Sequence, residues 1–132
     1  MRILIDTNIL FSTLLFPKSK PAYALLYAAN NHQIVLTDRN IFELREIIKR
    51  KKPNLLPAAE TFLAQLSFEL IPAVEDTTKT IRDVKDQPIL NGAIIADVDI
   101  ILTGDKDFLS LDSDRPKCMT AAEFLENEGA TA

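Results

Sequence analysis

Hydrophobic residues along the chain fall in blocks separated by prolines, asparagines and charged residues. Some blocks are only three to five residues long and nearly uninterrupted, which is typical of strands that a parallel sheet buries on both faces. The pattern predicts strands at residues 1–5, 34–36, 68–71, 99–103 and 117–119. The first of these strands ends abruptly at Asp6.

Between these blocks, apolar residues recur three or four positions apart, as on one face of a helix. This spacing predicts helices at residues 9–16, from about 19 to 29, and at 37–52, 57–66, 87–96 and 121–128, with a polar surface connection over 75–85. Proline stops the first and third helices, and Thr120 with Glu123 matches a capping box for the last one. The alternation predicts an α/β fold: three layers, α/β/α, around a mostly parallel sheet of about five strands.

Length and composition change this picture little. A chain of 132 residues has the usual size of one domain, so we expect a single domain over residues 1–132. One cysteine excludes an internal disulfide, and the sequence has neither a signal peptide pattern nor an apolar stretch of membrane-spanning length. We therefore expect a cytoplasmic protein that does not contact membranes.

The net charge of −4 comes from 19 acidic and 15 basic residues. Such a chain lacks the overall positive field that attracts nucleic acid, so any nucleic-acid substrate would be held by local cations. The run Arg45, Lys49, Arg50, Lys51 and Lys52 is most simply the end of a helix, where cations complement the helix dipole. It would also serve as a phosphate-contacting patch.

Acidic residues follow or open several predicted elements. Asp6 ends the first strand, Asp105 follows the fourth, Asp86 opens a helix and Glu43 lies near the start of another. Because the carboxyl ends of parallel strands meet at one edge of a sheet, these side chains are expected to converge. Each acid alone is also explained as a surface charge or, for Asp6, as a helix cap.

A converging cluster of carboxylates needs a counter-charge. Two like charges 4 Å apart repel by about 4 kcal/mol at an effective dielectric constant near 20. A hard divalent cation removes this repulsion, and Mg²⁺ prefers carboxylate and water oxygens while leaving positions for phosphate. The expected chemistry is therefore phosphoryl or phosphodiester transfer with metal-activated water.

Four stretches together resemble the PIN-domain family, and in particular the toxin-type PIN ribonucleases of prokaryotic toxin-antitoxin systems. They are Asp6-Thr7-Asn8-Ile9-Leu10, Glu43-Leu44, Asp83-Val84-Lys85-Asp86 and Thr103-Gly104-Asp105-Lys106-Asp107-Phe108-Leu109. The resemblance spans nearly the whole chain, roughly residues 1–125.

This resemblance implies an endoribonuclease that depends on Mg²⁺ or Mn²⁺, with its acidic pocket at the carboxyl edge of the sheet. Asp6, Asp86 and Asp105 would bind the metal, and Glu43 would orient the metal or the water. The resemblance also implies polar residues that support the pocket. These are Thr7, Asn8, Ser12, Thr103 and Asp107. The partners it implies are an RNA substrate, an antitoxin protein and a second copy of the chain in a dimer.

Some alternatives stay open at the level of sequence. Val84 stands where relatives often have proline, so Asp83 competes with Asp86, and Glu46 lies one helical turn from Glu43. The resemblance does not decide between one metal and two. A PIN-like module without catalysis is one rival function. A phosphatase with an aspartate nucleophile is another, although Asn8 replaces the second aspartate that such enzymes use.

Overall fold

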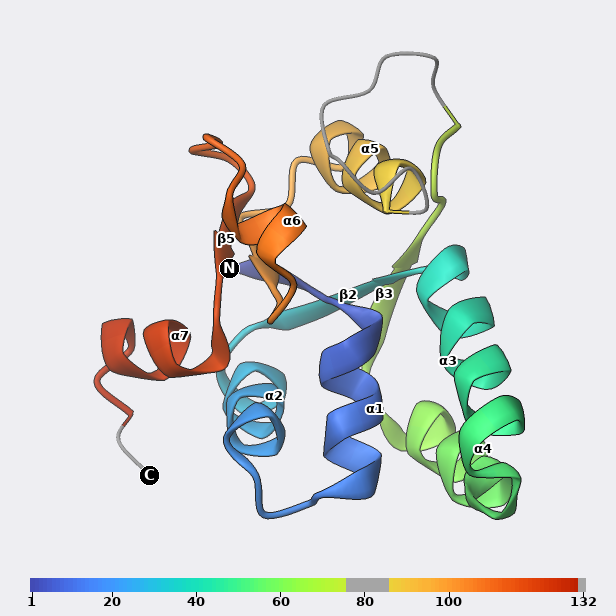
Figure 1. The fold of residues 1–132 in the computed structure, drawn as a ribbon. Helices are drawn as coiled ribbons and strands as arrows, with labels where there is room; N and C mark the ends of the chain where they lie inside the picture. The colour runs from blue at the N-terminus through green and yellow to red at the C-terminus, as the bar shows by residue number, and fades with distance from the viewer. Residues whose placement is uncertain (76–85, 131–132) are drawn as a thin grey trace.

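The structure is a computed structural model that describes residues 1–75 and 86–130. Five parallel strands form one sheet in the order β3-β2-β1-β4-β5 (Figure 1). The strands are β1 (Arg2–Ile5), β2 (Gln33–Thr37), β3 (Phe68–Ile71), β4 (Ile100–Leu102) and β5 (Lys117–Met119). The central strand β1 aligns Leu4 with Val35 on one side and with Ile101 on the other. The predicted α/β class and the five-stranded sheet are confirmed.

Helices cover both faces of this sheet (Figure 1). They are α1 (Thr7–Leu15), α2 (Lys20–Asn31), α3 (Asp38–Lys51), the 3₁₀ turn η1 (Pro53–Leu55), α4 (Leu56–Gln65), α5 (Gln87–Ile95), α6 (Lys106–Leu109) and α7 (Ala121–Asn127). Successive strand residues point to opposite faces. Ile3 and Ile5 pack in the core shared with α1, α2, α3, α4 and α7, while Leu4 packs with α5 and α6. The three predicted layers follow from this alternation.

The predicted elements agree closely with the observed ones, and the differences concern α1, α6 and η1. Helix α1 begins at Thr7, two residues before its predicted start, because Asp6 itself occupies the N-cap position. Helix α6 and the turn η1 were not predicted, since elements of three or four residues are too short for an apolar period. Most of the predicted polar connection, residues 76–85, lies outside the described part of the chain.

Helix α5 is held tightly against the segment that follows β3. The backbone nitrogen of Val74 donates to the carbonyl of Pro88 at 2.9 Å, and Nδ2 of Asn91 donates to the carbonyl of Val74 at 2.9 Å. A Cβ atom at Gly92 would lie 2.5 Å from the carbonyl oxygen of Pro72, so only glycine allows this approach. These contacts fix the start of α5, where Asp86 is the N-cap residue.

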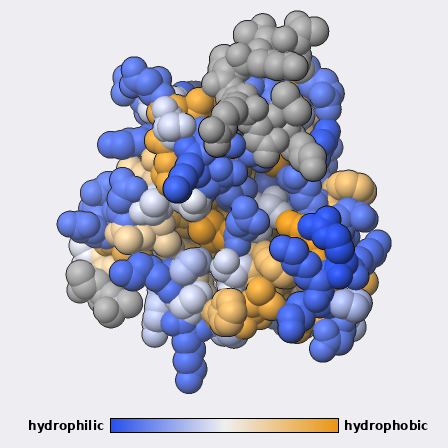
Figure 2. Space-filling model, in the orientation of Figure 1, coloured by the Kyte–Doolittle hydropathy of each residue, from blue (hydrophilic) through white to orange (hydrophobic). Residues whose placement is uncertain are grey.

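The surface carries hydrophobic side chains around α2. Figure 2 shows hydrophobic surface over α1 and α2 on the face that is drawn. Phe16, Tyr23 and Leu26 are among the large hydrophobic residues that remain exposed. Within residues 1–75 and 86–130, no helix is long and apolar enough to span a membrane.

Candidate functional site

Asp6 lies at the centre of the carboxyl edge of the sheet. Its backbone nitrogen donates to the carbonyl of Leu102 at 2.9 Å, which extends the pairing of β1 with β4 by one residue. The side chain is 5% exposed and makes no capping hydrogen bond to α1. Its Oδ2 atom instead accepts from the hydroxyl of Thr103 at 2.9 Å. Asp6 is thus the N-cap residue of α1 by position, but its carboxylate binds Thr103 and not the helix.

The turn after β4 places two further aspartates beside Asp6. The hydroxyl of Thr103, which donates to Asp6, accepts from the backbone nitrogen of Asp105 at 3.0 Å. Oδ1 of Asp105 accepts from the backbone nitrogen of Asp107 at 2.8 Å and so caps α6. One threonine hydroxyl therefore connects the end of β1 to the acidic turn.

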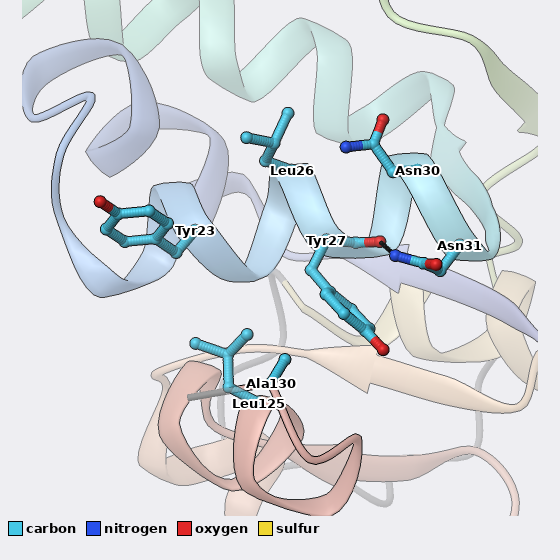
Figure 3. A pocket seen from close by; sticks show the side chains of 7 residues that line it. All are labelled: Tyr23, Leu26, Tyr27, Asn30, Asn31, Leu125 and Ala130. Carbon is cyan, nitrogen blue, oxygen red and sulfur yellow. Dashed lines mark hydrogen bonds between the residues drawn. The ribbon is translucent and has the colours of Figure 1, made fainter. Parts of the chain in front are cut away.

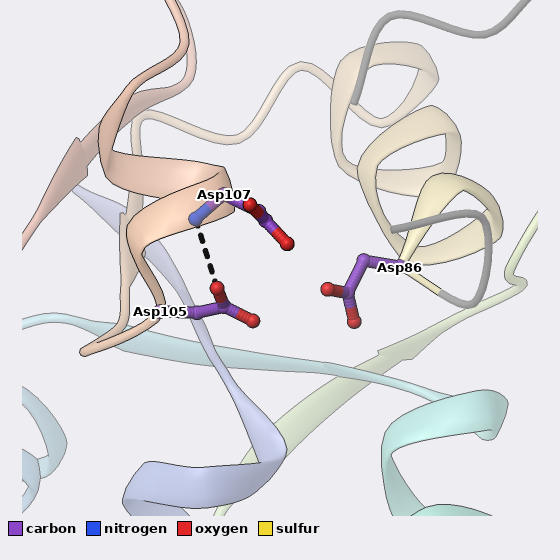
Figure 4. A group of neighbouring side chains, drawn as sticks. All are labelled: Asp86, Asp105 and Asp107. Carbon is purple, nitrogen blue, oxygen red and sulfur yellow. Dashed lines mark hydrogen bonds between the residues drawn. The ribbon is translucent and has the colours of Figure 1, made fainter. Parts of the chain in front are cut away.

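Asp86 approaches this turn from the start of α5. Asp86, Asp105 and Asp107 each present a carboxylate oxygen, and the three oxygens lie within 4.8 Å of one another. Figure 4 shows the three side chains directed toward one space between α5 and α6, with the hydrogen bond from Asp107 to Asp105 drawn. All three residues are half-buried. Residues from two distant parts of the sequence thus form a single acidic group.

Glu43 enters the site from α3. The hydroxyl of Thr7 donates to Oε1 of Glu43 at 3.4 Å, and Nδ2 of Asn40 donates to the hydroxyl of Thr7 at 3.1 Å. Thr7 and Asn40 are both buried. Asn40 lies three residues before Glu43, so both side chains lie on the same side of α3. Glu43 is in this way tied to the residue that follows Asp6.

Electrostatics mark Asp6 as unusual. Burial raises the pKa of Asp6 from 3.8 to about 6, and the negative charges of Asp105 and Glu43 raise it as well. Hydrogen bonds from Thr103 and from the backbone of Thr7 act in the opposite direction. These two acids come from different elements: Asp105 follows β4, and Glu43 lies on α3. The carboxyl edge therefore concentrates negative charge that the protein keeps partly away from water.

The donors suit a hard divalent cation. Oxygen ligands around one Mg²⁺ are about 3 to 4 Å apart, given metal–oxygen distances near 2.1 Å. The 4.8 Å limit for Asp86, Asp105 and Asp107 is slightly wider than this range, and a small side-chain rotation would bring the oxygens within it. All donors are carboxylate oxygens, which favour Mg²⁺ or Mn²⁺ over softer metals. The residues present therefore fit the predicted metal.

The structure does not place every predicted residue in this group. The acidic group of three contains Asp86, Asp105 and Asp107. Asp6 is linked to the turn that carries Asp105 through Thr103, and Glu43 is bonded to Thr7, the residue after Asp6. Glu46 is exposed and lies 3.9 Å from Lys49. Asp83 is outside the described residues. Asn8 is exposed and Ser12 half-buried on α1, so their part in the site stays a prediction.

Sequence reasoning missed Thr37 and Asn40 as parts of the site. Both are fully buried, and the backbone nitrogen and hydroxyl of Thr37 donate to Oδ1 of Asn40 at 3.0 and 2.8 Å. Thr37 is the N-cap residue of α3 and forms a capping box with Asn40. The available signal was asparagine at a helical position that the apolar period assigns to the core. A buried amide there needs partners, and here one of them is Thr7.

A separate hollow lies between α2 and α7. Tyr23, Leu26, Tyr27 and Asn30 of α2 line a groove of about 300 Å³ with Leu125 of α7 (Figure 3). Its lining contains no acid. The groove is consequently separate from the acidic site and has no groups for the same chemistry.

Comparison with known proteins agrees with the geometry. The sequence model described as the PIN domain matches residues 2–107, a range that includes Asp6, Glu43, Asp86 and Asp105. The chain belongs to the PIN domain family. The match ends at Asp107. It therefore includes every acid described above and does not include β5 and α7.

A solved structure supports the fold over a longer range. The chain resembles a chain in the crystal structure of VapBC2 from Rickettsia felis bound to a DNA fragment from their promoter, with a TM-score of 0.70 and 16% identity. The alignment covers 91% of this chain and 98% of that chain. At this identity the likeness shows a shared fold. No curated protein matches the chain.

Proposed function

We propose that this PIN domain protein is a metal-dependent endoribonuclease that hydrolyses RNA phosphodiester bonds, and that it is the toxin component of a toxin-antitoxin pair. The observation that carries the proposal is the acidic group of Asp86, Asp105 and Asp107 beside the buried Asp6. Membership of the PIN domain family and the likeness to VapBC2 support the same function.

In the proposed site, Asp6, Asp86 and Asp105 hold Mg²⁺ or Mn²⁺. A divalent cation bound there would bring the pKa of a water ligand toward neutrality and offset negative charge on the phosphate. Glu43 orients the metal or the water. Asp86 and Asp105 are half-buried, so part of each side chain is exposed to the solvent from which a phosphodiester would approach.

Neighbouring hydrogen bonds keep these carboxylates in place. The hydroxyl of Thr103 holds Oδ2 of Asp6, and the backbone nitrogen of Asp107 holds Oδ1 of Asp105. Groups of this kind commonly change metal affinity or activity by about 10- to 100-fold when they are removed.

The proposed partners follow from the same assignment. An antitoxin would cover part of the apolar surface around α2, where Phe16, Tyr23 and Leu26 are exposed. A dimer with a second copy of the chain would cover another part. RNA is the proposed substrate, and the cytoplasm is the proposed place of action.

The decisive experiment compares the parent protein with Asp6→Asn on a mixed RNA substrate. We expect cleavage by the parent with Mg²⁺ or Mn²⁺, none with chelator, and none by the variant, with both proteins folded by circular dichroism. Equal cleavage by both proteins would refute the assignment. Metal binding by a parent that cuts no RNA would favour a PIN-like module without catalysis.

Paired variants separate the alternatives that the sequence leaves open. Glu43→Gln and Asp86→Asn are expected to lower the cleavage rate strongly. Glu46→Gln and Asp83→Asn are expected to retain it. If Glu46→Gln lowers the rate and Glu43→Gln does not, the role passes to Glu46, and the same test decides between Asp83 and Asp86. Neither outcome changes the proposed reaction.

A further inference from the structure

Three buried side chains form a hydrogen-bonded line that ends at Glu43. Thr37, at the end of β2, donates to Oδ1 of Asn40, Nδ2 of Asn40 donates to the hydroxyl of Thr7, and that hydroxyl donates to Oε1 of Glu43. Thr37 and Asn40 are completely buried, and Thr7 is 5% exposed. The line joins β2, α3 and α1 underneath the acidic site.

The direction of each hydrogen bond in this line is determined by its neighbours. Oδ1 of Asn40 accepts from both the backbone nitrogen and the hydroxyl of Thr37, so the carbonyl end of the amide faces Thr37. The NH₂ end must then face Thr7, 3.1 Å away. Because the oxygen of Thr7 accepts this hydrogen, its own hydrogen is left for Glu43. The amide of Asn40 therefore sets the direction in which Thr7 donates.

We propose that Asn40 and Thr7 are positioning residues that orient the carboxylate of Glu43 toward the metal site, an inference that rests on the proposed nuclease function. The distance of 3.4 Å from Thr7 to Glu43 is long for a hydroxyl donor. A bond of that length is of modest strength, so the expected effect is at the lower end of the range for such supporting groups. We expect a loss of about tenfold.

Substitutions at Thr7 test this relay with little change of shape. Thr7→Val removes the hydroxyl and is expected to lower kcat about tenfold with KM for RNA unchanged. Thr7→Ser restores the hydroxyl and is expected to recover most of the loss. Thr13→Val, on the same helix, is the matched control, since its hydroxyl donates only to the carbonyl of Ile9 at 2.8 Å. It is expected to keep the parent rate.

A double-mutant cycle shows whether Thr7 acts through Glu43. In a Glu43→Ala background, Thr7→Val is expected to cause no further loss of kcat or of Mn²⁺ affinity measured by calorimetry. Losses that add would mean that Thr7 acts on the site in another way, and the relay would be wrong. An unchanged rate in Thr7→Val would overturn it as well.

A second double-mutant cycle, in the metal-free protein, separates this inference from the proposed function. With chelator present, urea unfolding of Asn40→Leu, Glu43→Ala and the double variant measures their coupling without metal or RNA. We expect the two losses of stability to be less than additive, and strict additivity would overturn the relay. If the parent neither binds Mn²⁺ nor cuts RNA, the proposed function fails, while this coupling still decides the relay. Thr7→Val in place of Asn40→Leu serves if the leucine variant does not fold.

Discussion

The two edges of the sheet treat their acids in opposite ways. At the amino edge, Arg2 donates from Nε and Nη2 to the two carboxylate oxygens of Glu69, at 2.9 and 2.6 Å. Arg115 binds Asp97 at 2.9 Å and Asp99 at 3.1 Å. At the carboxyl edge, acids face one another: one carboxylate oxygen from each of Asp86, Asp105 and Asp107 lies within 4.8 Å of the other two.

The pKa values record the same difference. The hydrogen bonds and charge of Arg2 lower the pKa of Glu69, whereas burial and the charges of Asp105 and Glu43 raise that of Asp6. Acids paired with arginine have their counter-charge in the chain itself, and such pairs serve the fold. A buried acid such as Asp6, whose pKa is raised by burial and by neighbouring carboxylates, has a reason to bind a cation from solution. We therefore propose that the acids of the amino edge serve the fold and those of the carboxyl edge serve the chemistry.

The largest expected effect tests this assignment directly. Asp105→Asn keeps the size and hydrogen-bonding shape of the side chain but removes a proposed metal ligand, so the RNA cleavage rate should fall by more than about 100-fold. Asp97→Asn is the matched control at the amino edge, because asparagine tolerates the φ of 57° found there. It should cleave RNA at the parent rate. Comparable losses in the two variants would mean that the edges do not differ in function.

How far the sequence predicts this arrangement depends on the kind of signal. The strand ends at Asp6 and at Thr103 with Asp105 could be predicted, because a buried strand is an apolar run and its end is visible. The helix start at Asp86 was visible for a related reason, since Pro88 and the apolar residues after it mark a first turn. Most of the fold and the main acids follow from such local patterns.

The supporting contacts could not be predicted in the same way. The capping role of Thr37 is local, but the bond from Asn40 to Thr7 joins residues 33 positions apart. The closeness of Asp107 to Asp86 depends on α6, which has four residues and no apolar period of its own. Gly92 has no visible role in the sequence until the backbone of Pro72 lies against it. These features depend on tertiary packing.

The next largest effect concerns stability at the carboxyl edge. Above pH 6, Asp6 is charged in the folded protein although burial opposes it, so the metal-free protein loses about 3 kcal/mol relative to low pH, where the group is neutral. Asp6→Asn should remove this loss and be more stable than the parent by a similar amount at about pH 8. The gain should shrink as the pH falls from 6 toward 3.8.

Urea unfolding with chelator at several pH values measures this gain. Added Mg²⁺ should then stabilise the parent and not Asp6→Asn, because binding to the folded state alone raises stability. If the parent is more stable than Asp6→Asn in chelator at high pH, the charge of Asp6 does not destabilise the metal-free protein and the prediction is wrong.

A smaller effect is expected at Gly92, where the packing of α5 against Pro72 positions Asp86 at the carboxyl edge. In Gly92→Ala, the new Cβ would lie 2.5 Å from the carbonyl oxygen of Pro72, which is backbone and cannot rotate away. Helix α5 should shift outward at a loss of about 1 to 3 kcal/mol, and Asp86 should move with it. Mn²⁺ affinity should therefore fall together with the melting temperature. Ala93→Gly is the matched comparison on the same helix, since it loosens α5 without pushing it outward.

The smallest effect is expected at the amino edge. Arg2→Met keeps an unbranched side chain but breaks the pair with Glu69, whose side chain is 41% exposed and can be hydrated instead. Solvent screening limits the loss to about 1 kcal/mol, and RNA cleavage should not change at temperatures where the variant is folded.

Because the pKa of Glu69 is lowered from 4.5, the contribution of this pair is present above that pH and is lost as the pH falls through the folded pKa. Its pH dependence is therefore opposite to that of Asp6. Thermal unfolding of both variants across the same pH series measures this contrast. As the pH rises, Arg2→Met should become less stable than the parent and Asp6→Asn more stable. Parallel changes in the two variants would contradict the distinction between the edges.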